Sequence, residues 1–140
     1  MLQFAGLWMA IAMFVGIWGG HVGVRWLEAH SVAIRPPALV LIGLGLALNA
    51  YSMAAHDLIA AGVSSIIGIT LLWDAFELYR QQRRVIKGHA PANPANLRHA
   101  AYLAAPGSHA TTADLLKRAP SDPTLPPQHA AVPPRAVIGD

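Results

Sequence analysis

The sequence predicts an all-α fold: three transmembrane helices followed by a Pro/Ala-rich, mostly irregular cytoplasmic tail with one or two short helices. Two observations predict this fold. Three long runs without a charged side chain fill the first part of the chain, and nine of the 11 prolines follow Gly88. Hydrophobic residues also make up 54% of the 140 residues, whereas charged residues make up 12%, about half the charge of a typical soluble domain.

Composition excludes several classes of protein. The low charge excludes an ordinary soluble enzyme, because a surface helix needs a polar face. The absence of cysteine excludes a disulfide-stapled domain and a cysteine-ligated metal site. The net charge of +3 does not indicate nucleic-acid binding, because basic residues gather directly after an apolar run, where juxtamembrane cations are expected: Arg80, Arg83, Arg84 and Lys87. We find no nucleophile elbow, metal-ligand spacing or phosphate loop, and we expect a protein that is not an enzyme.

The three apolar runs predict a transmembrane domain over residues 1–88 and a tail over residues 89–140. We expect the spans at about residues 2–26, 37–56 and 58–87. The first run reaches about 36 Å at about 1.5 Å per residue, which crosses a hydrocarbon core of about 30 Å. The third run has only 16 residues, so its helix must continue past Asp74 to Tyr79 or beyond. Two spans with one peripheral helix are the alternative.

The distribution of Lys and Arg predicts the orientation. Arg25 and Arg35 follow the first span, no basic residue lies between the second and third spans, and the basic stretch follows the third. Cytoplasmic segments carry the excess of positive charge. We therefore expect the amino terminus outside and the carboxyl terminus in the cytoplasm.

Small residues at four-residue steps predict where the helices pack. In a membrane, helices associate through close contacts and polar pairs. The first span offers Ala12, Gly16 and Gly20; the others offer Gly43 with Ala47, Ser64 with Gly68, and the polar Asn49. These residues could serve packing of the three helices against one another, or one groove could dock a neighbouring subunit. The two possibilities are compatible, because three helices leave much outer surface uncovered.

Six ionisable residues should gather near the cytoplasmic boundary: His21, Arg25, Glu28, Asp74, Glu77 and Arg80. Ionisable residues inside a membrane are candidates for function. Two ordinary interhelical pairs, His21 with Asp74 and Arg25 with Glu77, are the favoured explanation, because residues near the boundary can reach water. His21 and His56 lie at opposite membrane faces and cannot share a haem. His21 with His30 or His89 is geometrically conceivable, but nothing in the sequence supports it, and no cofactor is expected.

The segment from Trp73 to Pro94 has the sequence WDAFELYRQQRRVIKGHAPANP. It resembles the signature of the domain of unknown function 4491 family, in which a tryptophan-led helix end runs into an R-V-x-K-G turn and a P-x-N-P element. The matching positions are Trp73, Glu77, Leu78, Gln81, Arg84, Val85, Lys87, Gly88, Pro91, Asn93 and Pro94, and more weakly His21 and Glu28. The sequence departs from the family pattern in two places: His89-Ala90 stands where the family often has an aromatic pair, and Val22 stands where it often has a proline. The resemblance implies a small integral membrane protein of bacteria, hence a multi-pass protein of the cytoplasmic (inner) membrane, and implies no particular activity.

The same segment predicts local structure without the family. Gly88 is placed to end the third helix in the left-handed conformation, and Pro91 prevents its continuation. Arg83, Arg84 and Lys87 suit contact with anionic lipid or a partner, and Glu77 can pair with Arg80 or Gln81.

The tail offers two short helices. Asn93 could cap a helix over residues 94–105 that begins at Pro94 and carries Leu97, Ala101 and Ala104 on one side. Residues 111–119 could form another, with Thr111 and Asp114 as a capping box. By itself the tail buries too little apolar surface to hold one conformation.

We therefore expect a non-catalytic small integral membrane subunit or accessory protein that anchors or stabilises a larger membrane complex. Its partners would be lipid and other membrane-protein subunits, one of which the tail packs on. One alternative is a homo-oligomeric transporter or channel component with Asn49, His21 and Asp74 along a polar path. Another is a redox-complex subunit that contacts haem or quinone.

Overall fold

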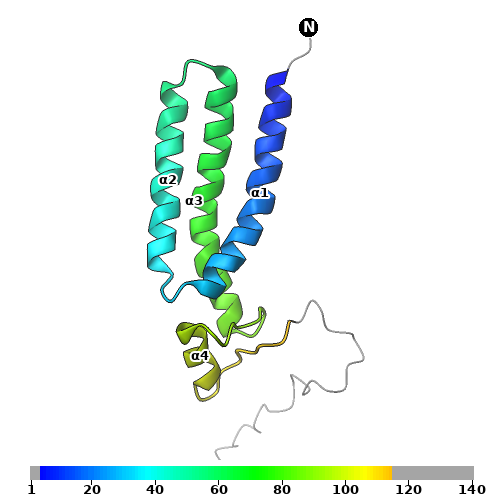
Figure 1. The fold of residues 1–140 in the computed structure, drawn as a ribbon, viewed down its shortest axis with the longest axis vertical. Helices are drawn as coiled ribbons and strands as arrows, with labels where there is room; N and C mark the ends of the chain where they lie inside the picture. The colour runs from blue at the N-terminus through cyan, green and yellow to red at the C-terminus, as the bar shows by residue number, and fades with distance from the viewer. Residues whose placement is uncertain (1–3, 115–140) are drawn as a thin grey trace, which may run out of the picture.

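The computed structural model describes residues 4–114, and this part of the chain is all-α. The helices are α1 (Phe4–His30), α2 (Arg35–Ala54), α3 (Leu58–Ile86) and α4 (Leu97–Ala104), with no strand among the described residues (Figure 1). The first three are each long and apolar enough to cross a membrane. The predicted all-α class with three long apolar helices is confirmed, and residues 115–140 of the tail lie outside the described residues.

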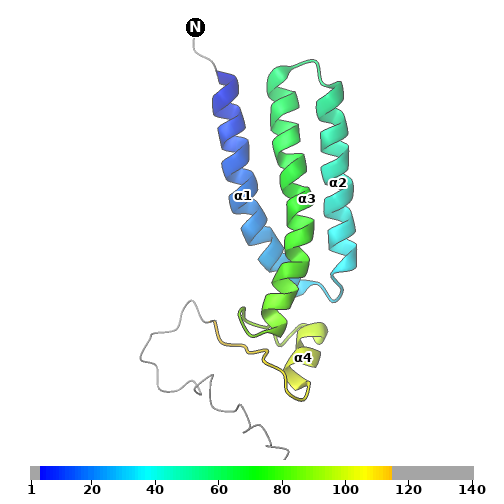
Figure 2. The ribbon, with the colours of Figure 1, turned by 180° about the vertical axis from the view of Figure 1, so that it is seen from behind.

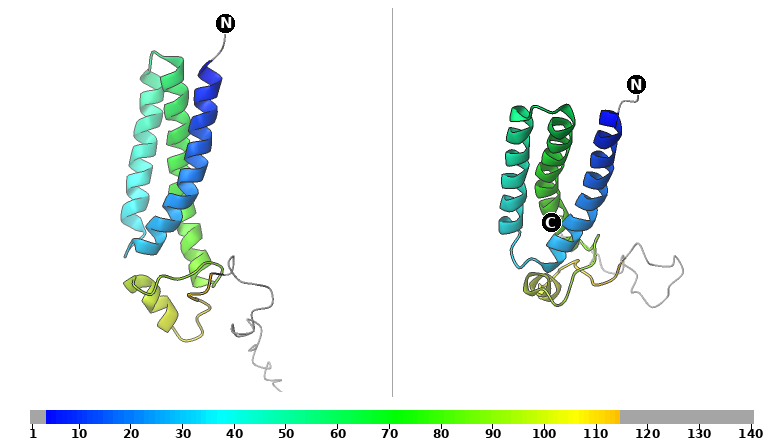
Figure 3. Two further views of the ribbon diagram at one scale, coloured as in Figure 1. Left: turned by 45° about the vertical axis from the view of Figure 1, so that its right-hand side comes forward. Right: turned by 45° about the horizontal axis from the view of Figure 1, so that its top comes forward.

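Helix α3 lies between α1 and α2 and contacts both (Figures 1 and 2). Helices α2 and α3 run side by side, whereas α1 leans so that its carboxyl end comes closest to α3. Helix α4 lies beyond the end of the bundle where α1 ends and α2 begins (Figure 3). One end of the molecule is therefore a bare helical bundle, and the other carries a small folded segment.

Local signals set the helix ends. Asp57 begins α3 by accepting a hydrogen bond from the Ala60 backbone N–H at 2.7 Å. Helix α2 begins at Arg35, with prolines in its first turn, where a missing N–H costs nothing. Helix α1 runs to His30, four residues beyond the expected end of its span.

Gly88 ends α3 as predicted. Its φ is +71°, and the N–H groups of Gly88 and His89 donate to the carbonyls of Val85 and Arg84 at 3.0 and 2.8 Å. These two bonds form a Schellman motif, which satisfies carbonyls that the helix end would leave without partners.

Glycine allows α2 and α3 to touch. A Cβ atom added to Gly45 would lie 2.8 Å from the carbonyl oxygen of Gly68, so the two backbones are in direct contact there. Asn49 packs beside Gly68 and donates to the Gly45 carbonyl at 2.7 Å. The expected pair Gly43 and Ala47 does not form this contact. Both are exposed, because the face of α2 that meets α3 is turned toward Gly45.

On the other side of α3, the small residues of α1 face the bundle. Ala12 and Gly20 are buried, and a Cβ atom on Gly16 would lie 3.1 Å from Thr70 Oγ1. Thus the first span uses its stripe of small residues for contact within the chain.

Large apolar side chains cover the outside of the three long helices. Phe14, Trp18 and Leu39 are each more than half exposed. Such a surface is unfavourable in water and normal in lipid, where tails are as apolar as leucine. The compact apolar contacts lie toward the α4 end, in a cluster formed by Val24, Ile34, Ala38 and Leu78.

Residues 89–114, which we call the cap segment, fold against the end of the bundle. Val85 of α3 packs there with Ala90 and Ala92, and partly with Tyr102 and Leu103. The Gln82 side chain donates to the Tyr102 hydroxyl at 2.7 Å. By itself the tail is expected to bury too little apolar surface to hold one conformation, and within residues 89–114 the chain's own α3 supplies apolar surface for it.

The predicted cap of the tail helix is wrong. Helix α4 begins at Leu97 with Asn96 as its N-cap, and Pro94 precedes the helix. Leu97 is 75% exposed, and the face turned inward carries His99 and Tyr102 instead. The four residues from Thr111 are not helical, and residues 115–119 of that predicted helix lie outside the described residues.

Candidate functional site

The strongest polar constellation joins α1 to the cap segment. Glu28, near the end of α1, is 1% exposed, and His99 of α4 is fully buried. Glu28 Oε1 lies 2.9 Å from His99 Nε2 and 3.0 Å from Arg98 Nη2. The positive charge of Arg98 compensates the buried carboxylate, which would otherwise be very costly.

Hydrogen bonds hold both nitrogens of the His99 ring. The backbone N–H of Asn93 donates to His99 Nδ1 at 2.9 Å. Nε2 lies 2.9 Å from Glu28 Oε1 and 3.1 Å from Arg98 Nη2. Because both nitrogens are occupied, the imidazole links two chain segments.

The same cap residues bind the backbone at the end of α1. Asn96 Nδ2 donates to the carbonyls of Ala29 and Ser31, each at 3.0 Å. Asn93 Nδ2 donates to the Ala29 carbonyl at 3.0 Å, and Arg98 Nη2 donates to the Glu28 carbonyl. A helix end leaves carbonyls without partners and carries partial negative charge, so these amide and guanidinium donors match it.

A second feature is a groove between α1 and α3 with a volume of about 280 Å³, which we call the lateral groove. Its walls are almost entirely apolar or glycine. The lining residues are Val15, Gly16, Gly19, Gly20, Gly23, Val24, Leu27, Leu41, Ile67, Thr70, Leu71 and Asp74. Asp74 is its one ionisable residue, is 8% exposed, and lies against Gly20.

Glu77 and Arg80 form a separate group on α3, in which Glu77 is buried and Arg80 is exposed. Glu77 lies 3.0 Å from Arg84 Nη1 and 3.6 Å from Arg80 Nε, both on its own helix. The expected pair between Arg25 and Glu77 is therefore wrong. Arg25 instead lines a pocket of about 150 Å³ with His89, Arg84 and four other residues. Gln81 does not bond to Glu77; its Oε1 accepts from Arg84 at 3.2 Å.

The structure thus divides the predicted cluster of six ionisable residues. Glu28 joins α1 to the cap segment, Asp74 belongs to the lateral groove, and Glu77 pairs with Arg80 and Arg84 along α3. His21 is exposed and makes no hydrogen bond to Asp74 within residues 4–114, although it acts on Asp74 electrostatically. The sequence analysis did not predict Arg98 and His99, because only the fold brings them to Glu28. The sequence did carry one indication of such a pair, since a carboxylate beside an apolar span needs a cationic partner.

A bundle of three apolar helices with a polar folded segment at one end defines a small membrane protein. A family model described as "Domain of unknown function (DUF4491)" matches residues 3–96. The chain belongs to this family, which confirms the resemblance seen in the segment from Trp73 to Pro94. The matched range contains Glu28, Asn93 and Asn96 and ends before Arg98. No curated protein and no solved structure matches the chain.

Proposed function

We propose that the protein is a non-catalytic subunit or accessory protein of a larger membrane complex in the bacterial cytoplasmic (inner) membrane. The outer face of α2 carries this proposal. Gly43 and Ala47, four residues apart, are exposed, and a Cβ atom on Gly43 would meet nothing within 4 Å. Within residues 4–114, this small-residue pair has no helix against it.

The chemistry of this face suits a partner helix. Small residues at four-residue spacing let two helix backbones approach closely, which is how transmembrane helices gain contact energy without hydrophobic exclusion from water. Helix α2 already makes one such contact on its other face, where Gly45 meets Gly68. A helix of another membrane subunit could use the outer pair in the same way.

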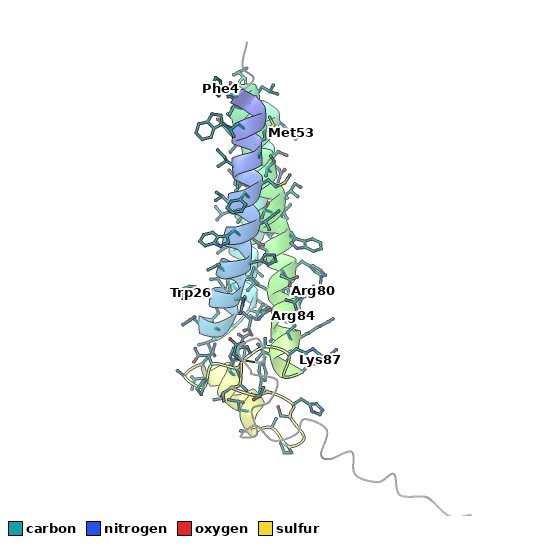
Figure 4. All side chains as sticks on the ribbon, turned by 90° about the vertical axis from the view of Figure 1, so that its right-hand side faces the viewer. Phe4, Trp26, Met53, Arg80, Arg84 and Lys87 are labelled. Carbon is teal, nitrogen blue, oxygen red and sulfur yellow. The ribbon has the colours of Figure 1, made fainter. Side chains whose placement is uncertain are left out.

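The proposed orientation is amino terminus outside and carboxyl terminus in the cytoplasm. Among the described residues, every Lys and Arg belongs to the end of α1, the start of α2, the end of α3 or the cap segment. Arg80, Arg84 and Lys87 lie toward this end, and Phe4 and Met53 lie at the other (Figure 4). The positive-inside rule assigns the basic end to the cytoplasm.

Two of the basic residues are free for outside contacts. Arg83 and Lys87 are exposed at the end of α3, whereas Arg84 is engaged by Glu77. We assign Arg83 and Lys87 to anionic lipid headgroups or to the partner. The cap segment next to them, held to α1 by Glu28, would present a fixed cytoplasmic surface to that partner.

Purification in mild detergent, followed by mass spectrometry, tests the proposal. The wild type should co-purify with a defined membrane protein in constant ratio, and Gly43→Leu should abolish the association. Gly6→Leu is the matched control, because Gly6 is also exposed with nothing within 4 Å of its Cβ position. A monodisperse monomer from the wild type, or equal retention by both variants, contradicts the proposal.

The homo-oligomeric transporter is the second candidate, because the ionisable Asp74 is buried in the groove between α1 and α3. Asn49 lies between α2 and α3, whereas Asp74 faces α1, so one chain does not bring them onto one path. A path through this protein would therefore require several copies. Cross-linking in membranes discriminates: ladders of self-adducts favour the transporter, and adducts with another protein favour the accessory subunit.

A further inference from the structure

We infer that the lateral groove is a binding site for a small lipophilic organic cation, with the Asp74 carboxylate as its counter-charge. The site lies between α1 and α3, away from the outer face of α2. It therefore goes beyond the proposed partner contact and does not depend on it.

Asp74 is buried and lacks a direct hydrogen-bond or ion-pair partner within residues 4–114. It is 8% exposed, and its favourable electrostatic neighbour is the exposed His21. A Cβ atom on Gly20 would lie 2.5 Å from Asp74 Oδ1, so the carboxyl group occupies space that only a glycine leaves open. A buried carboxylate without a partner is costly, and in a membrane such a residue marks a ligand or ion site.

No lysine or arginine lies beside this carboxylate. The lining of the groove contains neither, and Arg80 and Arg84 are engaged by Glu77. His21 acts on Asp74 attractively and Glu77 acts on it repulsively, but His21 is exposed and does not line the groove. The charge that complements the groove is therefore positive.

The walls decide what kind of cation fits. A divalent metal ion prefers about six oxygen ligands, and the groove offers one carboxylate and the Thr70 hydroxyl, which already donates to the Ile66 carbonyl at 2.8 Å. Val15, Ile67 and Leu71 instead present apolar surface. An organic cation whose charge is surrounded by apolar groups satisfies both the carboxylate and these walls.

Size and access point to the same ligand. The volume of about 280 Å³ lies just below the range of about 300 to 1,000 Å³ that is typical of ligand pockets. The lining runs along α1 from Val15 to Leu27, about 18 Å at 1.5 Å per residue, within the apolar span. The ligand therefore enters from the bilayer and must be small and lipid-soluble.

Equilibrium binding of radiolabelled tetraphenylphosphonium to the full chain in phosphatidylcholine nanodiscs tests this inference. Tetraphenylborate has the same shape and the opposite charge. We expect saturable binding of the cation at one site per chain and about tenfold or more weaker binding of the anion. Asp74→Asn should weaken cation binding by about tenfold or more, because it removes the charge and keeps the shape. Asp57→Asn is the matched control, since it removes an exposed carboxylate of the same helix and an asparagine still caps it.

A second pair of variants tests the groove itself. Gly19→Leu places a large side chain in the groove and should abolish binding. Nothing lies within 4 Å of the Cβ position at Gly19, so the substitution does not clash with the protein itself. Gly6→Leu makes the same change on α1 outside the groove and should bind as the wild type does. Circular dichroism and gel filtration check that each variant is folded.

Three results overturn the inference. The first is an absence of saturable binding by a folded wild type. The second is equal binding of the cation and the anion, or no effect of Asp74→Asn, which shows an apolar groove without charge selection. The third is a wild-type dimer that Gly19→Leu converts to a monomer, which shows that a second copy of the chain fills the groove.

Discussion

Glu28 and His99, 71 residues apart in the sequence, are joined by a hydrogen bond of 2.9 Å between Oε1 and Nε2, and both side chains are buried. Arg98 adds its charge to the same carboxylate at 3.0 Å. This junction connects the apolar bundle to the cap segment. It makes a folded surface out of a segment whose composition alone would leave it without a fixed structure.

Removing the Glu28 carboxylate should release the cap segment. In Glu28→Ala, Arg98 is left buried without its counter-charge and His99 without an acceptor, which costs roughly 3–5 kcal/mol. Glu28→Gln should be milder, because its amide oxygen still accepts from His99 Nε2. Hydrogen exchange of the backbone amides over residues 89–104 measures the effect. Arg80→Ala is the control, since its exposed contact with Glu77 is worth about 0–1 kcal/mol. Unchanged exchange in Glu28→Ala would contradict the structural role of the junction.

Gly88 should tolerate alanine less well than Gly107. Both have φ of +71°, where a side chain costs roughly 1–2 kcal/mol. In addition, the His109 carbonyl oxygen occupies the place of a Cβ atom at Gly88, whereas nothing lies within 4 Å of that position at Gly107. Thermal unfolding in detergent should therefore show a lower midpoint for Gly88→Ala than for Gly107→Ala. Equal midpoints would show that the close contact between Gly88 and the His109 carbonyl does not affect the free energy of unfolding.

Replacing Gly45 should separate α2 from α3. A Cβ atom there would lie 2.8 Å from the Gly68 carbonyl oxygen and 2.9 Å from the Leu72 side chain. Gly45→Val should lower the midpoint of thermal unfolding in detergent, because the Gly68 backbone cannot move aside for the new side chain without displacing α3. Gly43→Val, two residues earlier and facing outward, makes the same chemical change and should leave the midpoint nearly unchanged. The opposite order would show that α2 is rotated relative to this structure.

Single cysteines can test the orientation, since the chain has none of its own. His56→Cys lies in the turn between α2 and α3, and Lys87→Cys lies at the basic end of α3. A membrane-impermeant maleimide added to spheroplasts should label the first and not the second, and permeabilisation should expose both. Labelling of Lys87→Cys before permeabilisation would reverse the orientation.

Much of the fold could be predicted because it depends on local composition. Charge-free runs near the length of a bilayer predict membrane helices, and a glycine between Lys87 and His89 predicts the end of α3. The choice of contact face could not be predicted in the same way. Gly43 and Gly45 are two residues apart on one helix, and only the rotation of α2 against α3 decides which of them is buried.

For the candidate sites too, single residues could be predicted from the sequence and their contacts could not. Asp74 and Glu28 stood out as ionisable residues beside apolar runs, but their partners did not. Glu77 pairs within its own helix, as i, i+3 and i, i+7 neighbours can. Glu28 pairs with Arg98 and His99, which no periodicity links to it, and Asp74 has no partner among the described residues.

The amino-acid sequence by itself determined that this chain has the character of a membrane protein, how many long helices it forms, where α3 ends and which family it belongs to. These properties follow from hydropathy, charge and turn residues, which act over a few neighbouring positions. Only the tertiary structure decided which carboxylate is neutralised by the cap segment and which faces an open groove. That distinction depends on contacts between residues tens of positions apart, and those contacts exist only once the helices have packed.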